Sequence, residues 1–163
     1  MKTAIIYTSK HGTTEKIVAS IADKLKRTNE VEVFSLKKTP NPDISGFDTV
    51  MLGVPMYAGQ TSNNMKSFCK ANETVLLQKR TGLFVCGMEP IKEKQEKELK
   101  DAFPEVLQRN AVATGFLGGA FLFEKMNLFE RMIIKKIAKT TTSVERIDWE
   151  AMERFVEKMV QAH

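Results

Sequence analysis

The chain holds few of the residues from which metal centres and covalent catalysis are built. Its 163 residues include two cysteines, two histidines and one tryptophan. Cys69 and Cys86 stand far apart without the short spacing of zinc ligands, and each is interpreted as a reduced, partly buried thiol. His11 and His163 are isolated. We therefore expect no metal site and no histidine-based catalytic triad.

A long apolar run is also missing. No stretch approaches the roughly twenty apolar residues that span a bilayer, and the N-terminus lacks the pattern of a secretion signal. We therefore expect a cytoplasmic protein. An ordinary apolar content of 42% indicates neither a disordered nor a fibrous chain, and the length predicts one domain over residues 1–163.

Two common phosphate-binding motifs are absent. The sequence has no Gly-x-x-x-x-Gly-Lys-Ser/Thr for a nucleoside triphosphate, and no Gly-x-Gly-x-x-Gly follows the first predicted strand. The chain is nevertheless basic, with a net charge of +5 and a pI near 9.2, which favours an anionic partner or surface. No basic stripe is interleaved with aromatic residues, so we expect no nucleic-acid partner.

The opening of the chain, from Met1 to Asp23, has the most informative pattern. Residues 4–7 form an apolar run that predicts a strand buried on both faces. Residues 8–14 are rich in hydroxyls around one glycine, and a helix with Ile17, Ile21 and Leu25 on one stripe follows. A hydroxyl-rich turn at a helix start suits a phosphomonoester, because free backbone N–H groups and the helix dipole attract anions. The same residue types also fit a plain helix cap without a ligand.

The rest of the chain alternates predicted strands and helices. Strands are predicted at residues 31–34, 48–54 and 81–87, and residues 111–120 are predicted to hold the last strand and its exit. One intervening helix turns Met65, Phe68 and Cys69 inward, and residues 92–101 form a solvated helix anchored by Leu99 and Phe103. This alternation predicts an α/β fold with a doubly wound parallel sheet. Ligands bind such sheets at the carboxyl ends of the strands, where residues 8–14, 54–61 and 87–90 form glycine-bearing loops.

The last third contains a basic amphipathic segment from Lys125 to Lys139. It places four apolar residues on one stripe and most of its cations on the other side: Met126, Phe129, Ile133 and Ile137 on the first, Lys125, Arg131, Lys135, Lys136 and Lys139 on the second. Two interpretations stay open. The segment packs on the sheet with a solvated basic face, or it contacts an anionic membrane surface, an acidic partner or the carboxylates of a ligand. A closing helix begins near Asp148 and Trp149, interpreted as a cap and an aromatic core anchor.

Residues 8–14, Thr-Ser-Lys-His-Gly-Thr-Thr, resemble the phosphate loop of flavodoxins. Within that superfamily the chain is most similar to the flavodoxin-type, menaquinone-dependent protoporphyrinogen oxidases, chiefly in residues 119–121, 129–139 and 148–150. It departs from them in a shorter loop at residues 88–93, and Tyr57 stands where an arginine is common. The resemblance implies a flavodoxin-like, five-stranded parallel sheet of order 2-1-3-4-5 that binds FMN non-covalently.

The resemblance also implies which residues bind FMN. The phosphate is assigned to Ser9, Gly12, Thr13 and Thr14. The rest of the loop, Thr8, Lys10 and His11, is counted among the cofactor-binding residues, with a solvated loop lysine as the alternative for Lys10. One side of the flavin ring is assigned to Pro55, Met56, Tyr57, Ala58 and Gly59, and the other side to Cys86, Gly87 and Met88. A surface tyrosine at position 57 and a small buried hydrophobe at position 86 are the alternatives for those two residues.

The implied function is that of an FMN-dependent oxidoreductase similar to the protoporphyrinogen oxidases, which passes electrons to a quinone. The sequence offers no acid–base pair or nucleophile, so no catalytic side chain is assigned and the flavin carries the chemistry. Two alternatives remain. The first is a flavodoxin-like one-electron carrier that docks on a redox partner protein, although typical flavodoxins are acidic. The second is a flavin-free interaction module on the same fold.

Overall fold

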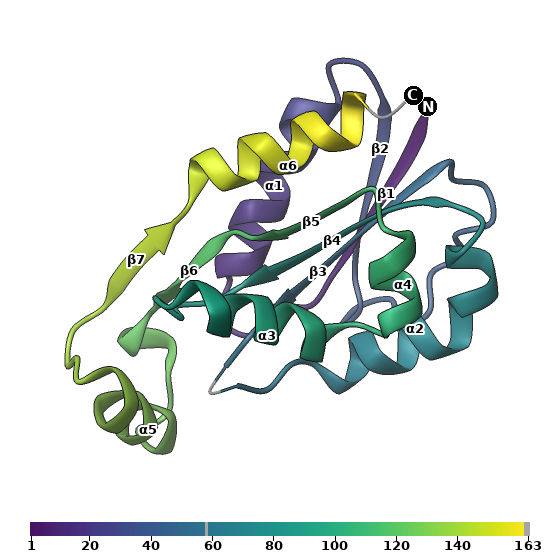
Figure 1. The fold of residues 1–163 in the computed structure, drawn as a ribbon. Helices are drawn as coiled ribbons and strands as arrows, with labels where there is room; N and C mark the ends of the chain where they lie inside the picture. The colour runs from purple at the N-terminus through teal and green to yellow at the C-terminus, as the bar shows by residue number, and fades with distance from the viewer. Residues whose placement is uncertain (58, 162–163) are drawn as a thin grey trace.

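The computed structural model describes residues 1–57 and 59–161. Its centre is a sheet of five parallel strands in the order β2-β1-β3-β4-β5 (Figure 1). The strands are β1 (Lys2–Tyr7), β2 (Glu30–Ser35), β3 (Thr49–Pro55), β4 (Arg80–Cys86) and β5 (Ala113–Phe116). The predicted doubly wound α/β fold and its strand order are therefore confirmed.

Helices cover both faces of this sheet and form two separate apolar cores (Figure 1). One face carries α1 (Thr13–Leu25) and α6 (Trp149–Gln161). The other carries α2 (Asn63–Leu76), α3 (Lys92–Ala102) and α4 (Glu105–Asn110). The central strands are apolar at nearly every position because both of their faces are covered, whereas the edge strand β2 is only partly buried.

The apolar periodicity of the first two helices is confirmed. On α1 the stripe of Ile17, Ile21 and Leu25 is buried against the sheet. On α2 the buried residues include Met65, Phe68 and Cys69, as predicted. Both cysteines are buried and free. The helices thus gain most of their stability from apolar area removed from water.

Residues 111–120, predicted as the last strand and its exit, contain the last strand of the sheet and the start of a second, smaller sheet. β5 ends at Phe116, and β6 (Gly118–Phe121) pairs antiparallel with β7 (Val144–Ile147) in a second sheet. The chain turns at Gly118, whose φ is +71°. A Cβ at this position would lie 2.1 Å from the Arg146 carbonyl oxygen, so the turn needs glycine.

The basic segment does not lie on the main sheet. A short 3-10 helix η1 (Phe123–Lys125) leads into α5 (Leu128–Ala138), which stands at the carboxyl edge outside both helix layers (Figure 1). The interpretation that this segment packs on the sheet is therefore wrong. Ile134 is the buried residue of α5, and it packs with a small cluster that includes Phe123, Met126 and Tyr57.

The apolar stripe predicted for this segment is buried at Met126 and partly buried at Ile133, and its other two residues are exposed. Phe129 is 70% exposed and Ile137 is 63% exposed, because α5 contacts the body through the side that carries Ile134. Trp149 is also no core anchor, since it is 41% exposed at the start of α6. The cap is confirmed, because Asp148 Oδ1 accepts a hydrogen bond from the Ala151 N–H at 2.8 Å. Within the described residues no helix is both long and apolar enough to cross a bilayer.

Gly53 on β3 gives a direct test of core packing. A Cβ at Gly53 would lie 2.1 Å from the Phe84 ring, which is itself buried against Phe155. We expect Gly53→Ala to lower the free energy of unfolding by about 1–3 kcal/mol through overpacking. Urea denaturation measures the change. The matched control is Gly46→Ala, where a Cβ meets nothing within 4 Å. Equal stability of the two variants would contradict this account of the core.

Candidate functional site

The loop between β1 and α1 leaves the start of the helix open. Gly12 is the N-cap residue, with φ +95°, and no side chain caps the helix. The interpretation of a threonine cap is therefore wrong, because Thr13 and Thr14 lie inside the first turn. Ser9 Oγ instead accepts a hydrogen bond from the Gly12 N–H at 3.0 Å and so fixes the loop. The N–H groups of the first turn and the positive end of the helix dipole remain available to an anion.

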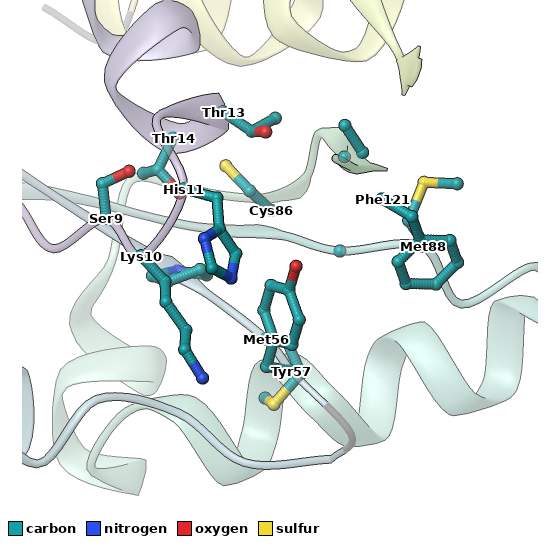
Figure 2. A pocket seen from close by; sticks show the side chains of 14 residues that line it. Ser9, Lys10, His11, Thr13, Thr14, Met56, Tyr57, Cys86, Met88 and Phe121 are labelled. Carbon is teal, nitrogen blue, oxygen red and sulfur yellow. The ribbon is translucent and has the colours of Figure 1, made fainter. Parts of the chain in front are cut away.

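Three loops surround one cavity at this edge of the sheet (Figure 2). Eleven of the predicted cofactor-binding residues line it: Ser9, Lys10, His11, Thr13, Thr14, Pro55, Met56, Tyr57, Cys86, Gly87 and Met88. The cavity measures about 30 Å³, since the side chain of Tyr57 extends into it. Two clefts of about 660 and 580 Å³ adjoin it and share Tyr57 as a wall.

The other predicted residues lie around this cavity. Thr8 lines the larger cleft and Gly59 lines the smaller one. Gly12 forms the turn that starts α1. Ala58 lies outside the described residues.

Sequence reasoning missed one wall of the cavity, which β6 supplies through Gly119, Ala120 and Phe121. β6 lies close to the loop after β4, because the Gly87 N–H donates a hydrogen bond to the Gly118 carbonyl at 2.9 Å. A Cβ at Gly119 would lie 2.9 Å from the Gly87 carbonyl. The adjacent glycines at positions 118 and 119 were the available signal, since such a pair marks a close backbone approach.

Tyr57 is the centre of a cluster of aromatic and charged side chains. Its ring centroid lies 5.3 Å from that of His11 and 5.1 Å from Lys10 Nζ, and its hydroxyl points toward the start of α1 (Figure 2). Burial, with a contribution from the charge of Glu130, raises the pKa of Tyr57 to about 12. Glu130 of α5 forms an ion pair with Lys10, and its Oε2 lies 3.5 Å from His11 Nε2. Burial lowers the pKa of His11, so the imidazole is neutral at pH 7.

Several buried hydroxyls at this edge have no hydrogen-bond partner among the described residues: Thr8 Oγ1, Thr14 Oγ1, Tyr57 OH and Thr61 Oγ1. Thr14 is 1% exposed and Thr8 is 6% exposed. Buried polar groups are nearly always paired. Thr49 and Thr81 at the opposite end of the sheet also have no partner in the described part of the chain, so these hydroxyls indicate a polar ligand because they lie at the edge where α1 starts uncapped. Together with the free first turn of α1, these donors fit a phosphate ester.

The remaining lining is mostly apolar and is chemically suited to a flat ring. Met56, Met88 and Phe121 present apolar side chains to the cavity. Burial raises the pKa of the Cys86 thiol to about 12, so its sulfur is protonated at neutral pH and is not a nucleophile. Among the described residues there is no cluster of three or more metal-ligating side chains. The residue types therefore fit the phosphate and the ring of FMN, and the ring requires the space that the Tyr57 side chain occupies in this structure.

Comparisons with known proteins agree with this geometry. A family model described as a flavodoxin domain matches residues 4–148. Protoporphyrinogen IX dehydrogenase [quinone] of Escherichia coli strain K12 is 20% identical over 171 residues, covering 98% of this chain and 94% of that protein.

Solved structures show the same fold. Oxidised flavodoxin 1 of Bacillus cereus is 19% identical with a TM-score of 0.63, covering 100% of this chain and 99% of that chain. Two-electron reduced flavodoxin of Megasphaera elsdenii is 16% identical with a TM-score of 0.58, covering 98% of this chain and 99% of that chain.

Glu98 is a second residue that sequence reasoning missed. The run from 92 to 101 was interpreted as a solvated helix face, yet Glu98 turns inward and lines the 580 Å³ cleft. Its Oε2 is buried without a hydrogen-bond partner among the described residues, 3.4 Å from a Cβ placed on Gly87. Burial, together with the charges of Glu89 and Asp101, raises the pKa of Glu98 to about 7. Charge patterning did not reveal it, because one inward residue in a charged helix leaves the pattern unchanged.

This pKa predicts a pH-dependent effect of Glu98→Gln on stability. The folded chain holds a proton on Glu98 up to about pH 7, whereas the ordinary pKa is 4.5. Between these values the folded state binds more protons, so the wild type loses stability relative to the variant as pH rises. We expect equal stability near pH 4 and a gain of about 2 kcal/mol for Glu98→Gln at pH 8, after allowance for solvent screening. Urea denaturation across pH tests this, with the exposed Glu96→Gln on the same helix as the control. The same pH profile in both variants would refute the assignment.

Proposed function

The chain belongs to the flavodoxin domain family, and from this premise we propose that it is a redox protein that binds FMN at the carboxyl edge of its sheet. The observation that carries the proposal is the pair of buried, unpartnered threonine hydroxyls, Thr8 and Thr14, beside the uncapped start of α1. These donors fit a phosphomonoester, which accepts several hydrogen bonds at once. The apolar lining beside them fits the ring.

Residues of three loops hold the cofactor in this proposal. Ser9, Thr13 and Thr14 bind the phosphate through hydroxyls and first-turn N–H groups. Met56 and Tyr57 lie on one side of the ring, and Gly87 and Met88 lie on the other. When bound, FMN supplies one- or two-electron redox chemistry, and the protein supplies binding, orientation and electrostatics.

We further propose that the chain oxidises a protoporphyrinogen and passes the electrons to a quinone. The similarity to the Escherichia coli dehydrogenase supports this, because it extends over 98% of this chain. The 580 Å³ cleft supports it too, since apolar Ile91, Phe121 and Ile137 line it together with the cations Lys94 and Arg146. The cleft also holds Glu89 and Glu98, so the carboxylates of a ligand would have to lie on the side of Lys94 and Arg146. Such a lining suits a large apolar molecule that carries carboxylates.

The activity is tested with purified, FMN-loaded protein supplied with protoporphyrinogen and a menaquinone analogue. We expect formation of the fluorescent porphyrin together with reduction of the quinone. FMN binding without turnover of either compound would contradict the substrate assignment and favour a carrier that exchanges electrons with a partner protein. Failure to bind FMN would contradict the proposal that the chain is an FMN-binding redox protein.

We also propose that α5 contacts an anionic membrane surface, where a quinone would be available. Its outward side exposes Leu128, Phe129 and Met132 beside Lys135 and Lys136. Apolar side chains flanked by lysines are typical of helices that lie in a bilayer interface, with the ammonium groups near lipid phosphates. A solvated position for the same residues leaves this apolar area in water.

The cofactor assignment predicts different effects of Thr14→Val on stability and on FMN binding. Thr14 Oγ1 is buried without a geometrically sound hydrogen bond among the described residues, and its polar neighbour is the Cys86 thiol, a weak partner, so its removal leaves stability about unchanged. FMN affinity falls by about 1–3 kcal/mol, because the phosphate loses a donor. Flavin fluorescence titration and urea denaturation measure the two quantities. Thr49→Val is the matched control, since Thr49 has the same unpartnered hydroxyl at the opposite end of β3. A similar loss of affinity in the control would show that the phosphate lies elsewhere.

The membrane assignment predicts selective binding to anionic lipid vesicles. We expect co-sedimentation with phosphatidylglycerol-containing vesicles and little with pure phosphatidylcholine. Reversing two charges in Lys135→Glu/Lys136→Glu should weaken binding at least tenfold, at about 1 kcal/mol for each cation lost. The control Lys26→Glu/Arg27→Glu makes the same charge change at the exposed end of α1, on the opposite edge of the sheet. Equal binding by the two variants would show that net charge, rather than α5, attracts the protein.

A further inference from the structure

The segment from Phe123 to Glu130 brings two opposite charges to the loop at the start of α1. Lys125, the last residue of η1, places its Nζ 3.4 Å from a Cβ built on Gly12. Glu130, in the first turn of α5, forms the ion pair with Lys10 and contacts His11 at 3.5 Å. Both charges therefore lie against residues 10–12 of the loop that leads into α1.

Local hydrogen bonds fix this segment in place. Asn127 and Glu130 form a capping box, in which the Glu130 N–H donates to Asn127 Oδ1 at 2.8 Å and the Asn127 N–H donates to Glu130 Oε2 at 3.0 Å. Arg131 Nε donates to the carbonyls of Phe123 and Met126 at 2.7 and 3.1 Å. The carboxylate of Glu130 is held 12% exposed, with one oxygen on the cap and the other on Lys10.

The Glu130 carboxylate forms an ion pair with Lys10, the cation that would otherwise pair with a phosphate at the start of α1. Lys10 is the cation of the loop itself, and its ammonium group is paired with Glu130. A phosphate dianion that binds beside Lys10 meets the negative charge of Glu130 in a half-buried place, where charges interact more strongly than in water. Lys125 acts in the opposite sense, because its ammonium group lies over Gly12.

We propose that Lys125 and Glu130 set the affinity of the phosphate subsite with opposite signs. Lys125 is a phosphate-binding cation supplied from outside the loop, and Glu130 is an internal anion that competes with the phosphate for Lys10. This inference rests on the proposed function, since it needs a phosphate ester at the start of α1. It extends that function, because it makes the segment between β6 and α5 part of the control of cofactor affinity.

The test compares FMN with riboflavin, which has the same ring and lacks the phosphate. Both dissociation constants are measured by fluorescence titration for the wild type, Glu130→Gln and Lys125→Gln. We expect FMN to bind about tenfold more tightly to Glu130→Gln and about tenfold more weakly to Lys125→Gln, the size of one charge pair near a protein surface. Riboflavin affinity stays unchanged in both. Glutamine keeps the capping box, so Glu130→Gln preserves the helix start.

The controls are Glu157→Gln and Lys158→Gln, which make the same charge changes at exposed positions of α6. They should leave both dissociation constants unchanged. Equal shifts for FMN and riboflavin, a weaker FMN affinity in Glu130→Gln, or no change in either variant would overturn the inference while FMN binding stands. Absence of FMN binding in every protein would overturn the proposed function as well.

Discussion

The N–H groups in the first turn of α1 have no side-chain cap, and the loops at the carboxyl edge of the sheet are arranged around this free helix end. Gly12 adopts a left-handed conformation that turns the chain into the helix without a side-chain cap. An uncapped, partly buried first turn is costly unless another group accepts its hydrogen bonds. Thr8 and Thr14 add to that cost, because their buried hydroxyls have no partner among the described residues. The protein thus gives up local stability at the place where three loops meet, which is characteristic of a binding site.

The sequence predicts the part of the fold in which each helix packs on the sheet and each central strand is covered by helices. Strands buried on both faces read as apolar runs, and helices on a sheet read as one apolar stripe. Ile17, Ile21 and Leu25 follow this rule. The order of the strands does not follow from it and was implied by the resemblance to flavodoxins. The predicted residues from the three loops lie around one cavity, since carboxyl ends of parallel strands share an edge.

Apolar periodicity does not predict the buried face of a helix that does not pack on the sheet. The stripe of Phe129, Ile133 and Ile137 on α5 is as regular as that on α1, yet α5 meets the body through Ile134. Periodicity shows which side of a helix is apolar, and it does not show whether protein, lipid or water lies against that side. The solvated position predicted for Glu98 is wrong for a related reason. Glu98 lies inward beside Gly87, and no local sequence pattern contains this contact. Both errors concern contacts between distant segments.

The charges at the site show why the overall charge of the chain is a poor guide to its partner. A net charge of +5 suggests attraction for anions everywhere, but the cations near the cavity come from separate elements and are partly neutralised. Lys10 is paired with Glu130, whereas Lys125 lies over Gly12. The electrostatic potential felt by a ligand at the start of α1 therefore depends on how the segment between β6 and α5 sits, and not on the sum of charges. The same segment carries the exposed apolar side of α5, so anything that binds that side acts on residues that adjoin the cofactor subsite.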